Sequence, residues 1–564
     1  MTHADLVFTG GPVFTADTVR SRATAVAVSG GRIVAVGGDD VRDLVGPRTE
    51  VVDLAGRMLL PGFQDAHVHP VWGGLDMLRC DLSRFETAAE YLDEIGRYAA
   101  SRPGEPWVLG GGWSMSAFPG GTPTAAALDA VVGDRPAFLP NRDGHGAWVS
   151  SAALRLAGID RRTPDPADGR IERDADGAPS GTLHEGAMGL VNRLLPDEPP
   201  ERLVEALLVA QRHLHSYGIT AWQDAIVGSY GDAGDPGPAY LAAAAAGTLT
   251  ARVVGALWWD RGAGLEQIPG LVERRERYRS HPGAHYPLPE PVEGRFAATS
   301  IKIMQDGVAE NFTAAMLEPY GDGHGHPTDN SGISFVDPAI LAEAVPQLDA
   351  LGFQVHFHAI GDRAVRECLD AVEHAIARNG RGGNRHHIAH LQVVHPDDVP
   401  RFRALGVAAN MQSLWAALEP QMVELTLPFL GSPRDAWQYP FGDLLRAGAV
   451  LAAGSDWSVS TPNPLAAIHT AVNRKAGRAW AEGDYDAFLP EQAIDLATSL
   501  TAYTAGSAWV NHLDAATGTV EVGKLADLAV LDRDPFAGPA DEIGDARVLQ
   551  TFVGGARVYS ADDA

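Results

Sequence analysis

Short apolar segments alternate with helical stretches through the middle of the chain, from about residue 59 to residue 456. The helical stretches are rich in Ala, Leu and Arg, and the apolar segments have the length of single strands. We expect eight strands, at Leu59 to His69, Ile219 to Asp224, Arg252 to Leu257, Ser300 to Gln305, Gln354 to His358, His387 to Gln392, Val407 to Gln412 and Val450 to Asp456. Strands that alternate with helices form parallel sheets, and eight such units close a barrel. The pattern therefore predicts an α/β fold, a (β/α)8 TIM barrel.

Both ends of the chain have the pattern of short β-strands separated by turns. The first sixty residues predict strands and no helix, with strands at Asp5 to Thr9, Ala25 to Ser29, Arg32 to Val36 and Glu50 to Leu54. The last fifty residues show the same pattern, in Gly518 to Asp532, Val548 to Val553 and Ala556 to Tyr559. Neither segment alone is long enough to bury a sheet face. We therefore expect one β-sandwich lobe, built from residues 1–57 and 516–564 around a barrel at 58–515.

The interval from Pro70 to about Val204 is too long for a loop between a strand and a helix. It predicts an inserted subdomain at about 71–204, after the first barrel strand. Within it, Ala137 to Asn141 predicts a strand outside the barrel, and the stretch from Gly110 to Gly121 predicts loops.

Composition narrows the classes of partner. The chain has 564 residues, 45% of them hydrophobic, which is ample for a large core. Its 44 basic and 72 acidic residues give a net charge of −28, which repels phosphate and anionic lipid. Nucleic acid and membrane partners are therefore not expected. The two cysteines, Cys80 and Cys368, predict buried thiols and not a disulfide framework. The chain begins without a basic and apolar leader, so we expect a cytoplasmic protein.

The candidate chemistry begins with two histidines at the end of the first predicted barrel strand. In Gln64-Asp-Ala-His67-Val-His69 the histidines are two residues apart, so both side chains project to one face of the strand. Two imidazoles on one face can hold one metal ion together. The motif alone is weak evidence, because many histidines serve structure.

Three more donors lie at the ends of later predicted strands. His358 is the last residue of Phe353-Gln-Val-His-Phe-His358. In the same way, His390 ends His387-Ile-Ala-His390, and Asp456 ends Val450-Leu-Ala-Ala-Gly-Ser-Asp456. Barrel enzymes keep their chemistry at the C-terminal ends of the strands. By spacing, His356 and His386 share a face with these donors but lie deeper, whereas His387 is expected on the opposite face. Four strands thus direct nitrogen and oxygen donors to one mouth.

With these motifs the chain resembles the amidohydrolase superfamily, and within it amidohydrolase family 3, which includes the N-substituted formamide deformylases. The resemblance covers nearly the whole chain. Its further motifs are Leu60-Pro-Gly-Phe-Gln-Asp-Ala-His67, Asp143-Gly-His-Gly-Ala-Trp148, Ile301-Lys-Ile-Met-Gln-Asp-Gly307, His358-Ala-Ile-Gly-Asp-Arg-Ala364, Gly454-Ser-Asp-Trp457 and Gly523-Lys-Leu-Ala-Asp-Leu528.

The resemblance implies a metal centre of one or two divalent ions, with zinc as the expected metal. It implies that the ligands are His67, His69, His358, His390 and Asp456, with Lys302 joining them when carboxylated by carbon dioxide. An ammonium group has no lone pair for a metal, so an unmodified Lys302 would instead make an ordinary ion pair. His145, Trp113 and Trp415 are candidates for the substrate pocket, because two lie in the insertion and one follows the seventh strand.

A centre of this kind activates water at neutral pH and polarises a carbonyl, while Asp456 can move the proton to a leaving nitrogen. We therefore expect a metal-dependent hydrolase of a C–N bond in a small molecule, with an N-substituted formamide or an N-acyl amine as the best guess. Hydrolysis of an ester, lactone, carbamate or cyclic amide is the alternative, and an inactive scaffold is a remote one. The sequence has no nucleophilic serine elbow and no phosphate-binding loop. A homodimer remains open.

Overall fold

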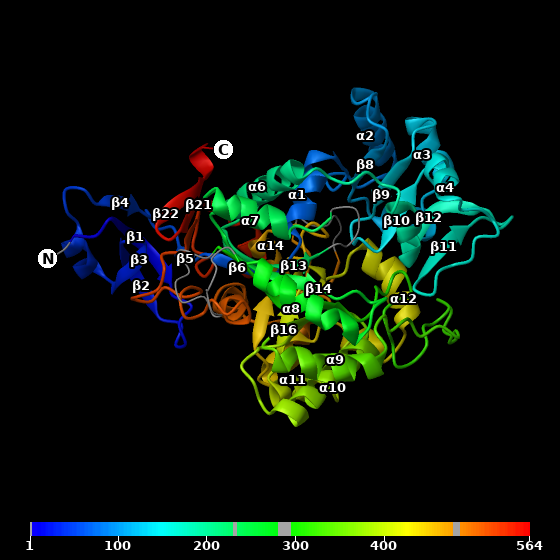
Figure 1. Cartoon of the computed structure of the whole chain (residues 1–564). Coiled ribbons are helices and arrows are strands. Elements are labelled where there is room, and N and C mark those ends of the chain that lie inside the picture. Colours follow the sequence, from blue (N-terminus) through cyan, green and yellow to red (C-terminus); the bar gives the residue numbers. More distant parts are fainter. Residues whose placement is uncertain (1–2, 229–233, 280–294, 478–484, 564) are drawn as a thin grey trace.

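The computed structural model describes residues 3–228, 234–279, 295–477 and 485–563. Figure 1 shows three regions: a sheet lobe that contains both ends of the chain, a central barrel surrounded by helices, and an insertion that extends from the barrel on the side away from the lobe.

Eight parallel strands form the predicted barrel, in the order β6-β13-β14-β15-β16-β17-β18-β19. Their bounds are β6 Phe63–Val68, β13 Ile219–Val227, β14 Arg252–Trp258, β15 Phe296–Met304, β16 Gln354–Ala359, β17 His387–His390, β18 Ala408–Met411 and β19 Leu451–Ala453. The backbone N–H of Asp456 donates to the carbonyl of His67 at 2.8 Å, and that of His69 donates to the carbonyl of Trp457 at 2.7 Å. These bonds link the ends of the first and last strands.

Two expected strands differ from the observed ones. The segment Leu59 to His69 is interrupted at Gly62, so β5 (Leu59–Pro61) pairs in the lobe sheet and only β6 belongs to the barrel. A Cβ atom on Gly62 would lie 2.3 Å from the side chain of Thr220, which explains why glycine occupies this junction. The last barrel strand stops at Ala453, and Asp456 stands in the loop beyond it.

Helices cover the outside of the barrel and face it with apolar side chains. In α6, for example, Leu203, Leu207 and Leu214 recur at helical spacing and are buried. The helices around the barrel are α1 Pro70–Leu78, α6 Pro200–Ser216, α7 Gly237–Ala245, α8 Ile268–Arg277, α9 Pro338–Ala350, α10 Asp362–Asn379, α11 Val399–Leu405, α12 Leu427–Leu430, α13 Phe441–Arg446, α14 Pro464–Asn473, α15 Leu496–Thr501 and α16 Ser507–Val510.

The two ends of the chain build one lobe, whose strands join in a single sheet of order β22-β21-β20-β5-β1-β2-β3, with β4 also paired to β1. The bounds are β1 Leu6–Phe14, β2 Arg22–Ser29, β3 Arg32–Gly37, β4 Glu50–Asp53, β20 Leu528–Leu531, β21 Val548–Val553 and β22 Ala556–Ser560. Strands β1 and β21 are three places apart, about 14 Å in a flat sheet. Yet the rings of Phe8 and Phe552 lie 5.1 Å apart, so the sheet folds over its own core. The expectation of a lobe without helix was wrong, because a 3-10 helix spans Asp39–Leu44.

The insertion has a sheet of its own, richer than the single strand expected there. Its six strands have the order β11-β12-β10-β9-β8-β7. Their bounds are β7 Cys80–Asp81, β8 Val108–Gly111, β9 Ala137–Pro140, β10 Gly146–Val149, β11 Gly169–Arg173 and β12 Pro179–Glu185, with helices α2 Ala88–Ser101, α3 Ala125–Val132, α4 Ser151–Ala157 and α5 Gly189–Asn192. The expected loop region therefore begins with the end of strand β8.

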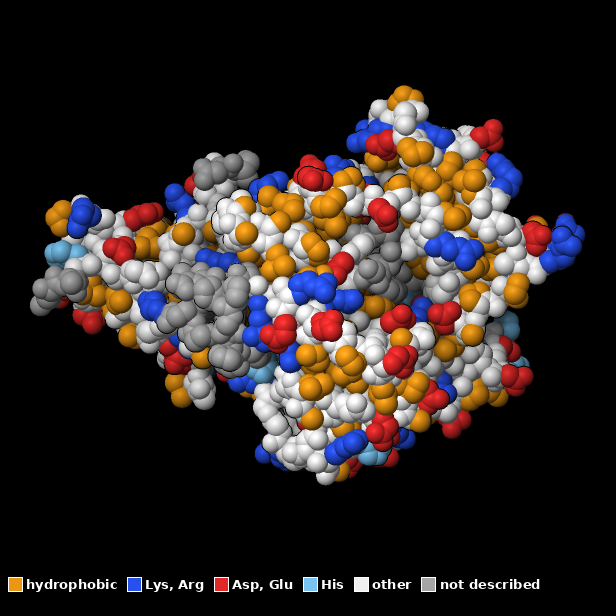
Figure 2. Space-filling view, viewed as in Figure 1, with side chains coloured by type: hydrophobic (Ala, Val, Ile, Leu, Met, Phe, Trp, Pro, Cys, Tyr) orange, Lys and Arg blue, Asp and Glu red, His pale blue; other side chains and the backbone are white. Residues whose placement is uncertain are grey.

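Charged side chains of both signs are interspersed with hydrophobic ones over the face of the molecule shown in Figure 2. Cys80 and Cys368 are buried free thiols, as expected. Among the described residues, none of the helices combines the length and the apolar character needed to cross a membrane.

Candidate metal centre and cavity

The five predicted donors meet at the C-terminal mouth of the barrel. His67 lies in β6, His69 follows it, His358 lies in β16, His390 ends β17, and Asp456 follows β19. All five side chains are buried. They line one cavity of about 380 Å³ together with Lys302 and His145. The strand ends of the barrel and the insertion thus enclose a common space.

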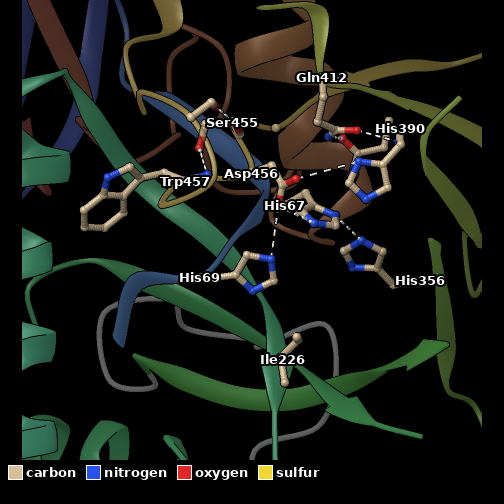
Figure 3. Close-up of polar contacts among 12 residues, drawn as sticks. His67, His69, Ile226, His356, His390, Gln412, Ser455, Asp456 and Trp457 are labelled. Carbon is tan, nitrogen blue, oxygen red and sulfur yellow. Dashed lines mark hydrogen bonds and ion pairs between the residues drawn. The ribbon is translucent and has the colours of Figure 1, made fainter. Parts of the chain in front are cut away.

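Asp456 is the centre of this cluster (Figure 3). Its Oδ1 atom lies 3.1 Å from the Nε2 atoms of both His67 and His69. Its Oδ2 atom lies 3.8 Å from Nδ1 of His390. The ring centroids of His358 and His390 are 4.3 Å apart, so His358 belongs to the same group. The donors of His67, His69 and Asp456 are close enough together to hold one metal ion.

A chain of hydrogen bonds inside the barrel determines the tautomer of His67. The side-chain amide N–H groups of Gln354 donate to the backbone carbonyls of Arg385 and Val510, so its Oε1 atom accepts from Gln223 at 3.0 Å. This orients the amide of Gln223, whose Oε1 atom then accepts from Nδ1–H of His356 at 2.6 Å. The neutral His356 ring is left with an acceptor at Nε2.

His67 therefore donates its Nδ1–H to His356 at 2.7 Å, and its Nε2 atom carries a lone pair. That lone pair faces the carboxylate of Asp456 at 3.1 Å. Two acceptors at this distance repel unless a cation lies near both. His390 offers two further buried nitrogens, and His69 one, that have no hydrogen-bond partner among the residues that the structure describes. The donor set therefore fits a bound metal ion.

The charge states suit this role. Burial and the nearby Lys302 hold the pKa of His67 well below its usual range, and burial with His390 does the same to the pKa of His358. Both imidazoles are neutral at pH 7 and can donate lone pairs. Burial raises the pKa of Asp456, but the hydrogen bond with His69 and the electrostatic influence of His390 outweigh it, so the pKa lies below its usual value. Asp456 is therefore ionised.

Lys302 projects into the cavity from β15 and is 2% exposed. Burial disfavours its ammonium form, and the carboxylate of Asp456 offsets this only in part, so the pKa of Lys302 falls to about 7. A substantial share of Lys302 is therefore a neutral amine at pH 7.

His145 and Glu185 bring a second polar group to the cavity, from the insertion. The Nδ1 atom of His145 lies 2.9 Å from Oε1 of Glu185, and the His145 ring lies 5.5 Å from the ring of His358. Burial opposes the imidazolium, but the carboxylates of Glu185 and Asp143 outweigh it and raise the pKa of His145 to about 9.

An apolar wall stands at the ends of three neighbouring barrel strands. Ile226 of β13, Trp258 of β14 and Met304 of β15 form a hydrophobic cluster separate from the main core, and Trp72 packs against it. All four residues line the cavity. The cavity is therefore polar at the histidine cluster and apolar beside it.

Two predicted pocket residues lie elsewhere. Trp113 is fully buried in the core of the insertion, where its indole N–H donates to the carbonyl of Leu139 at 2.8 Å. Trp415 stacks on His390 with ring centroids 6.1 Å apart and does not line the cavity. Aromatic size favours burial in the nearest core, and sequence position alone does not show which core that is.

The expected faces of His386 and His387 were wrong. His387 points into the barrel, where its Nε2–H donates to Gln223 at 3.1 Å, and His386 pairs with Asp349 outside. His390 has a φ of 79°, which breaks the alternation of side chains at the end of β17. His390 therefore reaches the cavity although His387, three residues earlier, also points inward.

Sequence reasoning missed Glu185 and Gln223 altogether. Glu185 precedes a glycine at the end of an insertion strand that we did not expect, and Gln223 lies within an apolar barrel strand. Neither residue lies in a sequence motif that indicates a metal ligand or a general base. An inward-facing amide on a barrel strand is the signal that could have identified Gln223.

The chain is similar to known proteins along nearly its whole length. The model of a family described as the amidohydrolase family matches residues 50–559. The protein LONG AFTER FAR-RED 3 of Arabidopsis thaliana is 31% identical over 99% of this chain and 92% of its own. The N-substituted formamide deformylase of Arthrobacter pascens is 28% identical over 98% of each chain. Among solved structures, an uncharacterized metal-dependent hydrolase from Pyrococcus horikoshii superposes with a TM-score of 0.71 and 24% identity, covering 95% of this chain and 99% of its own.

Proposed function

This chain belongs to the amidohydrolase family, a family of hydrolases that act on carbon–nitrogen bonds, and on that premise we propose that it is a metal-dependent enzyme that hydrolyses a small amide. The substrate class we propose is an N-substituted formamide or an N-acyl amine. One observation carries the proposal: the lone pair on Nε2 of His67 faces the Asp456 carboxylate at 3.1 Å, and both residues are buried and line the cavity. Such a pair of acceptors is a ligand set for a cation.

The residues that would hold the metal are His67, His69, His358, His390 and Asp456. Neutral imidazoles with a carboxylate suit zinc, which we propose as the metal. When bound, one or two divalent ions would act as a Lewis acid toward a carbonyl oxygen and would make water more acidic.

Lys302 is a further ligand in this proposal. Its neutral amine can attack carbon dioxide, which forms an N–C bond, releases one proton and leaves a carbamate with two oxygen donors. The low pKa of Lys302, about 7, favours this reaction because an ammonium group cannot attack. The modified side chain would lie in the same cavity as the histidines.

Asp456 moves the proton in this mechanism. Its ionised carboxylate accepts a proton from the water that attacks the carbonyl carbon, and then donates that proton to the leaving nitrogen as the C–N bond breaks. The water supplies OH to the acyl carbon and H to the nitrogen, so the products are a carboxylic acid and an amine. The hydrogen bond with His69, at 3.1 Å, holds the carboxylate toward the cavity.

The cavity accommodates the rest of the substrate. His145 adds a polar group to the same cavity as the apolar wall of Ile226, Trp258 and Met304. Apolar surface removed from water contributes about 25 cal/mol per Å², so this wall favours a substituent of aromatic or aliphatic character. The cavity volume, about 380 Å³, is large enough for a small molecule.

The experiment is metal analysis joined to a substrate panel. Purified protein is analysed for bound metal and assayed with formamides, N-acyl amines, lactones, esters and carbamates, before and after chelation. We expect zinc in the protein and hydrolysis of an amide that is lost with the metal. If the protein hydrolyses only esters, lactones or carbamates, its substrate class is not an amide. If it binds no metal and is inactive, only a binding role remains.

A further inference from the structure

The insertion supplies His145 and Glu185, a buried pair that the proposed reaction does not yet use. His145 immediately precedes β10, and Glu185 ends β12. Both line the cavity, although neither lies on a barrel strand. Their side chains are 9% and 1% exposed.

The pair is held from several sides. Oε1 of Glu185 accepts from Nδ1–H of His145 at 2.9 Å and from the hydroxyl of Thr313 at 2.8 Å. The backbone carbonyl of His145 accepts from the side-chain amide of Asn311 at 2.9 Å and from the backbone N–H of Glu185 at 3.0 Å. The backbone N–H of His145 donates to Asp143 at 2.9 Å. The backbone of His145 is thus fixed, and the bond to Glu185 orients its imidazole.

Stability alone does not favour a buried ion pair at this place. A buried ion pair costs desolvation energy, and hydrophobic residues of the same volume often stabilise a protein better. Glu185 also has a φ of 51° with a ψ of −129°, a strained conformation that L-residues rarely adopt. Strain of this kind persists where the side chain must be held in one place. Here it directs Glu185 at His145.

One nitrogen of the His145 ring remains available to a ligand in the cavity. A carboxylate only accepts hydrogen bonds, so Nδ1 of His145 is the donor to Glu185, and Nε2 is the nitrogen turned away from that contact. The His145 ring lies 5.5 Å from the ring of His358, beside the histidine cluster. A carbonyl oxygen bound at that cluster is within reach of Nε2.

We propose that His145 binds the acyl oxygen of the substrate through Nε2, and that Glu185 is the positioning residue that holds its imidazole in place. The inference rests on the proposed function, because it names the group that meets the amide in that cavity. It assigns to the insertion a role in stabilising charge on the oxygen as water attacks.

The test compares Glu185→Ala, His145→Ala and the double variant in the full-length, zinc-loaded enzyme, with the best amide of the panel. We expect Glu185→Ala to lower kcat about 100-fold with KM changed less than about 3-fold, because the contact strengthens in the transition state. The double variant should be no slower than His145→Ala, because Glu185 acts only through His145. Glu185→Gln, which keeps an acceptor, should lie between Glu185→Ala and the parent enzyme.

A matched control lies in the same sheet. His184 pairs with Glu172 at 3.1 Å, and neither residue lines the cavity. Glu172→Gln should leave kcat within about 2-fold of the parent enzyme. Losses that multiply in the double variant, or a Glu185→Ala enzyme within about 3-fold of the parent, would overturn the proposal. So would a loss that follows zinc content or melting temperature.

A second measurement separates this inference from the proposed function. If the parent enzyme hydrolyses no amide, the proposed function fails, and the pair is tested with formate by titration calorimetry on the zinc-loaded protein. We expect formate to bind the parent at least 10-fold more tightly than Glu185→Ala or His145→Ala. Equal affinities, or no binding to the parent, would overturn the role of the pair.

Discussion

Nδ1 of His67 lies 2.7 Å from Nε2 of His356, and this contact connects the metal centre to the polar interior of the barrel. His356 is in turn held by Gln223, whose amide is oriented through Gln354. Hydrogen bonds of this kind fix the tautomer of a metal-binding imidazole and raise its basicity. The backbone carbonyls that anchor Gln354 therefore decide which nitrogen of His67 faces the cavity.

Replacing His356 with Phe should weaken metal binding. An aromatic ring is kept, but His67 loses the acceptor for its Nδ1–H, and metal affinity should fall about 10-fold to 100-fold. Competition with a chromophoric chelator measures this. His386→Asn is the control, because His386 pairs with Asp349 outside the barrel and should leave the affinity unchanged. Equal affinity in His356→Phe would show that the tautomer of His67 is fixed in another way.

Replacing Asp456 with Asn should separate metal content from turnover. The amide keeps one oxygen donor but cannot accept the proton, so kcat should fall about 10²-fold to 10⁴-fold while much of the metal stays bound. Metal analysis and steady-state kinetics on the same preparation give both quantities. A near-normal kcat would show that another group transfers the proton and that Asp456 serves only as a metal ligand.

The buried amine of Lys302 should react with carbon dioxide to form a carbamate. After removal of metal and bicarbonate, recovery of activity with zinc should be faster and more complete when bicarbonate is added. A carbamate signal in ¹³C NMR with labelled bicarbonate should appear in the parent protein and not in Lys302→Met. If both proteins give the same spectrum, Lys302 is not modified, and its amine has another partner.

Acid should destabilise the protein through His215. Burial lowers the pKa of His215 from 6.5 to about 4, while Ile219 and Thr250 hydrogen-bond the neutral ring. A base whose folded-state pKa is lowered contributes stability that is complete above pH 6.5 and is lost as pH falls toward 4. The contribution is at most about 3 kcal/mol.

Urea unfolding at several pH values checks this expectation. His215→Gln should flatten the dependence of the unfolding free energy on pH between 6.5 and 4. The control is His374→Gln, a histidine of helix α10 outside the barrel, which should retain the slope of the parent protein. An unchanged slope in His215→Gln would assign the acid effect to other buried histidines.

The lobe and the barrel should depend on one buried ion pair. Arg252 of β14 donates to Asp527 at 2.7 and 3.0 Å, and both side chains are at most 2% exposed. Asp527→Ala removes the buried carboxylate that balances the charge of this guanidinium, so the free energy of unfolding should fall by about 3–5 kcal/mol. Combining Arg252→Met with Asp527→Leu should cost less than Asp527→Ala alone. Chemical denaturation of the parent protein, Asp527→Ala and the double variant measures the free energy of unfolding of each. A double variant that is the least stable of the three would contradict this expectation.

The sequence by itself determined the kinds of element and the chain order of the donors. Alternating apolar segments predicted the eight barrel strands, and strand-end motifs predicted that His67, His358 and Asp456 face one mouth, because both signals are local. A strand's period and a motif's spacing depend on residues close together in the chain. The lobe strands could be predicted in the same way, although the break at Gly62 could not.

Only the tertiary structure decided which side chains meet. His387 and His390 both point inward because the backbone turns to positive φ at the strand end. The regular alternation of side chains along a strand does not predict such a turn. Trp113 is buried in the core of the insertion, and Glu185 reaches the cavity from a segment more than a hundred residues away from β16. These positions depend on packing between distant segments, where burial and hydrogen bonding are settled by the whole fold and not by local pattern.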